Sequence, residues 1–179
     1  LAMAALISFT FTILGILYGK NLLIFLGAKN VILELAWHYL STMVIGLPFM
    51  VFSGFFRSIL AGEGDMKFPM MIAGLGTIMN IILDPIFIFK LEKFGNIGLG
   101  LGIKGAALAT VISQFIVFII FIYMLFVKKH AYVAFNLKDF SPSRLILWDI
   151  VKVGVPASLS MTIMAMGQGV FNKILINYS

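Results

Sequence analysis

Asn80 and Asp84 carry the polar groups best placed to do chemistry in this chain, because both lie inside a long apolar run. The run covers residues 74–89, GLGTIMNIILDPIFIF, and Asp84 is its only ionisable side chain. An ionisable residue in a stretch long enough to cross a bilayer is costly to keep there, so by default it marks a path for an ion, a proton or a substrate. We therefore expect Asp84 to bind a cation or a proton.

Neighbouring residues add further oxygen atoms to this position. Asn80 and Asp84 are four residues apart, so on a helix they share a face, and Thr77 adds a hydroxyl to roughly the same face. Pro85 has no N–H, so the carbonyl of Ile81 loses its helical partner and is free to face a cavity. Carboxylate, amide and carbonyl oxygens within one turn suit a hard cation such as Na+, with Asp84 and Asn80 as ligands, or a proton held on the carboxylate.

The composition identifies the class of protein that must position these groups. Hydrophobic residues make up 61% of the chain and charged residues 11%, with a mean hydropathy of +1.10. Such values lie far outside the range of soluble domains. The net charge of +6 is spread singly or in pairs between apolar runs, which excludes a nucleic-acid patch, and the absence of cysteine excludes disulfide and thiol chemistry. The sequence predicts an all-α polytopic membrane protein with the lipid bilayer as a partner.

Apolar runs of about 20 residues, the length that crosses the hydrocarbon core, predict five transmembrane helices. The predicted spans cover residues 2–25, 37–60, 68–89, 103–127 and 153–176. The first span is interrupted near its end by Lys20 and Asn21, so it could equally stop at Gly19.

Residues 128–152 are expected to form a cytoplasmic connection, because Lys and Arg accumulate there. Within this connection, residues 144–152 (RLILWDIVK) are amphipathic enough to lie along the membrane interface, with Trp148 at the level of the headgroups. Gly154 and Pro156 then offer a place for the chain to bend before it enters the fifth span.

The fourth span begins with small residues that favour close packing against the third. Gly102, Ala106 and Ala109 permit such an approach. From the shared connection, Asp84 and Thr110 lie at depths of about 8 and 10 Å at 1.5 Å per residue. Thr110 is therefore expected to reach the level of Asp84.

Four stretches resemble consecutive motifs of the multidrug and toxic compound extrusion (MATE) transporters. They are residues 61–70 (AGEGDMKFPM), 80–85 (NIILDP), 105–110 (GAALAT) and 153–156 (VGVP). The order and spacing also agree with that family. The resemblance places the chain, as an internal fragment, at about helices three to seven of a twelve-helix, two-lobe transporter. Residues 1–127 would then be part of the N-terminal lobe, and residues 153–179 the first helix of the C-terminal lobe.

The resemblance implies a multi-pass transporter of the plasma membrane that is not an enzyme. It would export amphipathic, often cationic drugs by alternating access, driven by H+ or Na+ and needing no other cofactor. The family's cation-site asparagine, aspartate and threonine match Asn80, Asp84 and Thr110. The family's second acidic residue lies on its first helix and has no counterpart here. The expected partners are small organic substrates and the remainder of the transporter chain, with no nucleic acid.

Other roles remain open for the individual residues. Asp84 could be a structural carboxylate, Asn80 an interhelical hydrogen-bonding group, and Thr110 a donor to its own backbone. The fifth span carries Met161, Met164 and Gln168, which suit an adaptable drug-contacting wall but equally suit packing against helices or lipid.

Other functions are open too. A lipid-linked sugar flippase or polysaccharide exporter of the same superfamily is the main alternative, although its pyrophosphate cargo would call for cationic residues, not an aspartate, inside the membrane. An intramembrane enzyme would need a nucleophile with a base, or a metal cluster, at one depth. His38 and His130 lie at the ends of spans. A purely structural membrane subunit would tolerate the loss of the Asp84 charge.

Overall fold

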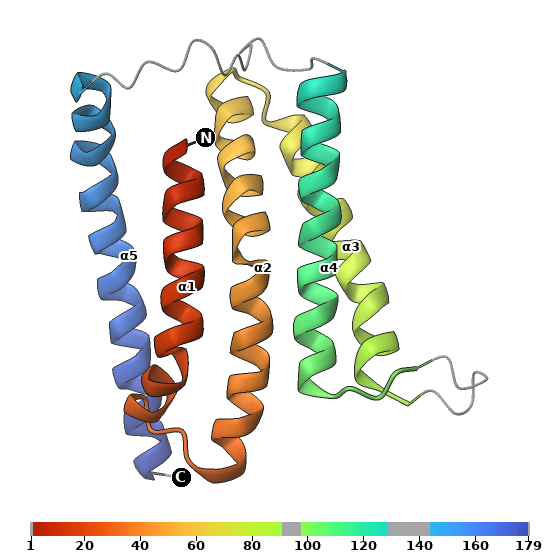
Figure 1. Ribbon diagram of the computed structural model, residues 1–179, viewed down its shortest axis with the longest axis vertical. Coiled ribbons are helices and arrows are strands. Elements are labelled where there is room, and N and C mark those ends of the chain that lie inside the picture. The colour runs from red at the N-terminus through yellow and green to blue at the C-terminus, as the bar shows by residue number, and fades with distance from the viewer. Residues whose placement is uncertain (1, 91–97, 129–143, 179) are drawn as a thin grey trace. The chain divides into compact units, whose positions relative to one another are not determined.

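The computed structural model describes residues 2–90, 98–128 and 144–178, and every regular element in these ranges is a helix (Figure 1). The helices are α1 (Ala2–Phe25), α2 (Asn30–Gly62), α3 (Lys67–Ile88), α4 (Ile103–Ile122) and α5 (Arg144–Tyr178), and α4 continues into a π-helical turn, η2 (Tyr123–Val127). Five of these segments are long and apolar enough to cross a membrane, which confirms the predicted polytopic all-α class. The chain divides into two compact units, Leu1–Val133 and Ala134–Ser179.

Two helices begin well before the residues that hydropathy suggested, while α1 has the predicted bounds of residues 2–25. α1 runs through Lys20 and Asn21 to Phe25, so the alternative end at Gly19 is wrong. α2 begins at Asn30, seven residues before the apolar run, and α5 begins at Arg144, nine residues before Val153. An apolar run marks the part of a helix that fits the hydrocarbon, whereas backbone hydrogen bonding continues into the polar flanks. Whether residues 144–152 lie along the membrane interface stays a prediction.

The four helices of the first unit pack in the order α1, α2, α4, α3. α4 packs against both α2 and α3, while α1 packs against α2 (Figure 1). α2 and α4 run in the same direction, antiparallel to α1 and α3. This order puts α4, which carries Thr110, directly beside α3, which carries Asn80 and Asp84.

Small residues on α1 allow it to approach α2 closely. A Cβ atom on Gly15 would come within 2.9 Å of both methyl carbons of Val44, and one on Gly19 would come 3.0 Å from the Trp37 ring. Ser8 is fully buried on the same helix. In lipid the hydrophobic effect does not drive helices together, so close van der Waals contact of this kind holds the pair.

The seam between α2 and α4 is filled by aromatic side chains. Phe49 and Phe115 meet edge to face with ring centroids 4.9 Å apart, and Phe56 contacts both Phe118 and Phe121. Phe121 is fully buried. Aromatic pairs in these geometries add stabilisation beyond the area that they bury, so they fix α4 against α2.

The turn between α2 and α3 is a compact cap for both helices. Gly64 has a φ of +88°, a conformation that favours glycine, and its N–H donates to Ala61 O at 3.1 Å while Asp65 N–H donates to Leu60 O at 2.9 Å. The Asp65 carboxylate then accepts the N–H of Phe68 at 3.0 Å, which caps the start of α3. This turn fixes where α3 begins relative to α2.

Candidate cation site

The close approach of α4 to the end of α3 sets the geometry of the site. A Cβ atom on Gly105 would collide with the carbonyl oxygen of Phe87 and lie 2.6 Å from its carbonyl carbon, so only glycine fits there. The segment that leads into α4 also folds back on α3, because Leu99 N–H donates to Ile86 O at 2.8 Å and Leu101 N–H donates to Phe87 O at 2.9 Å. The two backbones therefore start side by side.

The sequence predicted the close contact between α3 and α4, but a different small residue makes it. Gly102, Ala106 and Ala109 were the expected small residues, and Ala109 is indeed fully buried. The tightest contact belongs to Gly105, the first residue of the GAALAT motif. Its signal was present as one more small residue, but the facing backbone carbonyl cannot be read from a sequence.

Asn80 connects Asp84 to Thr110 across the two helices. With the amide nitrogen toward the carboxylate, Asn80 Nδ2 donates to Asp84 Oδ2 at 3.3 Å, and Asn80 Oδ1 accepts from Thr110 N at 3.3 Å and Thr110 Oγ1 at 3.2 Å. With the amide turned over, Nδ2 donates to Thr110 Oγ1 at 3.2 Å and to Asp84 Oδ1 at 3.5 Å. The turned form leaves the amide oxygen facing acceptors only, so the first orientation satisfies both ends of the amide.

Thr110 accommodates either orientation because a hydroxyl both donates and accepts. Its Oγ1 lies 3.0 Å from Ala106 O, one turn back in α4, and 3.2 Å from the Asn80 amide. The hydroxyl thus makes the ordinary bond of a membrane threonine to its own helix and, in addition, a contact to the neighbouring helix.

The possible accessory residues of α3, Thr77, Ile81 and Pro85, are more exposed than Asn80 and Asp84. Asp84 and Asn80 are half-buried, while Ile81 and Pro85 are exposed at the surface of the first unit. Pro85 lies inside α3, where it withholds the N–H that the Ile81 carbonyl would otherwise accept. Thr77 is also exposed, and its hydroxyl donates to Ala73 O in its own helix at 3.1 Å, so it does not join the side-chain contacts of Asn80.

The donor set at Asp84 suits a monovalent cation or a proton. The groups that Asn80 joins are the Asp84 carboxylate, its own amide and the Thr110 hydroxyl, and each of them carries an oxygen atom of the hard kind. Within residues 2–90, 98–128 and 144–178, no three His, Cys, Asp or Glu side chains gather as they would around a transition metal.

The predicted drug-contacting residues lie on α5, which belongs to the second unit. Met161, Met164 and Gln168 are spaced so that they share one helical face, and all three are exposed on this helix. Met161 and Met164 each have 76% of their surface exposed. Exposure is similar on all sides of this part of α5, so it does not distinguish this face, and its contact with drugs stays a prediction.

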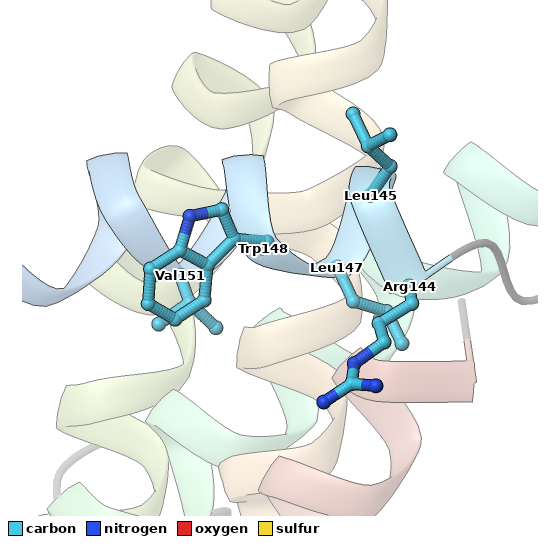
Figure 2. A pocket seen from close by; sticks show the side chains of 5 residues that line it. All are labelled: Arg144, Leu145, Leu147, Trp148 and Val151. Atoms are coloured by element: carbon cyan, nitrogen blue, oxygen red, sulfur yellow. The ribbon is translucent and has the colours of Figure 1, made fainter.

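The first turns of α5 form a separate feature. Figure 2 shows the Trp148 ring beside Val151 and the Arg144 guanidinium beside Leu147, around a hollow that Leu145 also lines. A guanidinium, an indole and aliphatic side chains together are typical of residues at a membrane–water interface. The hollow does not include Asp84, Asn80 or Thr110.

Comparison with known proteins identifies the family. Residues 1–86 match the MatE family. The multidrug export protein MepA of Staphylococcus aureus is 32% identical over 163 residues, which are 90% of this chain and 34% of MepA. A multidrug resistance MATE transporter of the MOP superfamily, solved in an inward-facing conformation, is 40% identical with a TM-score of 0.79 over 89% of this chain and 34% of its own.

An outward-facing structure of a multidrug resistance MATE family transporter gives 38% identity and a TM-score of 0.81, over 92% of this chain and 34% of its own. The 179 residues thus span about a third of the length of these relatives. The MatE match includes Asn80, Asp84 and most of α3, whereas α4 with Thr110 lies beyond it. The chain belongs to the multidrug and toxic compound extrusion (MATE) family.

Proposed function

We propose that the full-length protein is a cation-coupled exporter of amphipathic, cationic drugs or toxic organic compounds. The chain is a multi-pass protein of the plasma membrane, and its relatives are transporters, not enzymes. The observation that carries the proposal is a series of side-chain hydrogen bonds from Asp84 to Asn80 and from Asn80 to Thr110. These bonds connect an intramembrane carboxylate to the neighbouring helix.

A turn of the Asn80 amide would couple the state of Asp84 to Thr110, because either assignment of its oxygen and nitrogen places the amide between the two residues. With its nitrogen toward the carboxylate, Asn80 Nδ2 donates to Asp84 and Oδ1 accepts from Thr110. A Na+ ion at Asp84, or a proton on it, needs an acceptor oxygen in place of that donor. We propose that the amide then turns until its oxygen faces the cation or proton while Nδ2 donates to Thr110 Oγ1, whose hydroxyl donates to Ala106 O. This turn must also break the 3.5 Å contact that Nδ2 makes with Asp84 Oδ1.

This exchange links ion binding to helix packing. Thr110 lies five residues after Gly105, where α4 lies closest to α3, so a change in the bonds between Asn80 and Thr110 acts on the contact between the two helices. Alternating access requires bundles that adopt more than one arrangement, and a ligand shifts such an equilibrium only through different interactions in each state. The inward- and outward-facing structures of relatives support such a cycle.

The nature of the cargo is supported by charge and by relatives. The charge inside the predicted third span is acidic, which favours a cation over the pyrophosphate of a lipid-linked sugar. The exposed methionine face of α5 suits substrates of varied shape, because methionine repacks readily. The relative MepA is a multidrug export protein.

The proposal is tested by drug efflux from inverted vesicles that contain the full-length parent, with Na+ and H+ gradients imposed separately. We expect one gradient to drive transport in the wild type and Asp84→Asn to abolish that gradient-driven transport. Glu34→Gln is the matched control, since Glu34 is an exposed acid near the start of α2.

The protein level and melting temperature of each variant would be measured in parallel. Normal efflux by a well-folded Asp84→Asn variant would refute ion coupling through this residue and make Asp84 structural. Gradient-independent transport in the wild type would refute secondary transport altogether.

A further inference from the structure

Pro48 interrupts the hydrogen-bond ladder in the middle of α2. Because proline has no N–H, the carbonyl of Val44, four residues earlier, has no partner in its own helix. Val44 is buried, with 6% of its surface exposed. A buried carbonyl without a partner is costly, and more so in a bilayer, where no water replaces the missing donor.

Thr12 of α1 supplies a hydrogen-bond donor to the Val44 carbonyl. Its hydroxyl donates to Val44 O at 3.4 Å, across 32 residues of sequence. The hydroxyls of Thr42, Ser58, Thr77, Thr110, Ser160 and Thr162 instead donate to the carbonyl four residues back in their own helix. Thr12 thus departs from the usual behaviour of a membrane threonine at the one carbonyl of α2 that Pro48 leaves unpaired.

The surrounding contacts hold Thr12 at this carbonyl. Gly15, one turn further along α1, packs directly on the Val44 side chain, with a would-be Cβ 2.9 Å from its methyl carbons. The distance of 3.4 Å is long for a hydroxyl donor, which usually lies about 2.7–2.8 Å from its acceptor. A long bond of this kind is readily broken and remade without disturbing the helices on either side.

The break in α2 lies next to the turn of α4 that carries Thr110. A Cβ atom on Gly46 would come 2.5 Å from Val111 Cγ2, and Val111 directly follows Thr110. A change in the course of α2 at Pro48 would therefore press on, or withdraw from, this turn of α4.

We infer that Thr12 is a releasable clamp on the proline break of α2: its hydroxyl replaces the hydrogen bond that Pro48 withholds, and its release lets the two halves of α2 change their angle. This inference concerns the packing of α1 on α2 and stands independently of the ion-coupling proposal. It predicts that removing the Thr12 hydroxyl changes the bend of α2 only while residue 48 is proline.

The bend can be measured directly by pulsed electron paramagnetic resonance with spin labels at Ile32 and Ser58, which are exposed on α2 on either side of Pro48. The 179 residues contain no cysteine, so labelling cysteines can be placed at these two positions in a full-length parent freed of any others. The labels are 26 residues apart, or about 39 Å along a helix, which suits the method.

We expect Thr12→Val to broaden or shift the distance distribution, and Thr12→Ser, which keeps the hydroxyl, to leave it unchanged. In the Pro48→Ala background, where Val44 O regains its helical donor, Thr12→Val should have no effect. Thr42→Val is the matched control, because the Thr42 hydroxyl bonds to His38 O at 2.9 Å, a carbonyl that already accepts a helical N–H.

Three results would overturn the clamp. The first is an unchanged distribution in Thr12→Val, the second is an equal change in Thr12→Ser, and the third is an equal change with and without Pro48. If Pro48→Ala does not fold, the comparison of Thr12→Val with Thr12→Ser decides the matter on its own.

Discussion

Asn80 and Thr110 lie 30 residues apart in the chain, yet their side chains meet at 3.2 Å across the α3–α4 contact. This contact lies beside the intramembrane carboxylate of Asp84, to which Asn80 also bonds. Because the Thr110 hydroxyl can donate or accept, it serves the amide in either orientation. Through this pair, binding of an ion or a proton at Asp84 can change the contact between α3 and α4.

Removing the Thr110 hydroxyl should weaken binding of the coupling ion without unfolding the protein. In Thr110→Val the Asn80 amide loses its hydroxyl partner in α4, and we expect the ion concentration for half-maximal transport to rise about tenfold, equivalent to roughly 1.4 kcal/mol. Thr110→Ser keeps the hydroxyl and should remain near wild type. Equal behaviour of the valine and serine variants would show that the hydroxyl has no part in ion binding.

Adding a methyl group at Gly105 should push α4 away from α3. In Gly105→Ala the new Cβ would collide with the Phe87 carbonyl, and overpacking of this kind costs about 1–3 kcal/mol. We expect a lower melting temperature in detergent and weaker ion-driven transport. Gly74→Ala on α3 is the control, since nothing lies within 4 Å of its Cβ position. Alanine is the better helix former, so Gly74→Ala should be neutral or slightly stabilising. Comparable losses in both variants would refute the close contact at Gly105 as the cause.

The sequence was sufficient for the parts of the fold that depend on local geometry. Apolar runs located all five helices, and the four-residue spacing placed Asn80 and Asp84 on one face because helical periodicity alone dictates it. Thr110 was found by counting residues from a shared connection, which works when two helices are antiparallel neighbours. The roles of these residues in ion binding stay predictions.

Features that depend on the register between helices were not predictable in this way. Thr77 shares a face with Asn80 by spacing, but its hydroxyl turns to Ala73 O because that carbonyl is always within reach of a helical threonine. The bond from Thr12 to Val44 O requires knowing which turn of α1 lies beside the break at Pro48. Hydropathy carries no information about such alignment.

The carboxylate of Asp65 should contribute to stability through its cap on α3. Its acceptance of the Phe68 N–H satisfies a donor at the start of the helix, so Asp65→Ala should cost about 1 kcal/mol and lower the melting temperature. Asp65→Asn is the matched variant, because an asparagine oxygen can make the same cap. A loss in Asp65→Asn as large as in Asp65→Ala would show that the charge of Asp65, and not its cap, stabilises the turn.

Shortening a side chain on the methionine face of α5 should change which drugs are exported. Met164 is 76% exposed on its helix, and Met164→Ala removes flexible apolar surface from that face. We expect transport of the bulkiest cationic substrates to fall about fivefold, as loss of roughly 1 kcal/mol of contact would produce, while small substrates are little affected. Met70→Ala on α3 is the control, since Met70 is similarly exposed but lies outside the predicted drug wall. Vesicle transport across a size-graded series of cations provides the measurement. A uniform decrease for every substrate would place Met164 in helix packing, because a packing defect slows the whole cycle, whereas a contact residue discriminates between cargoes.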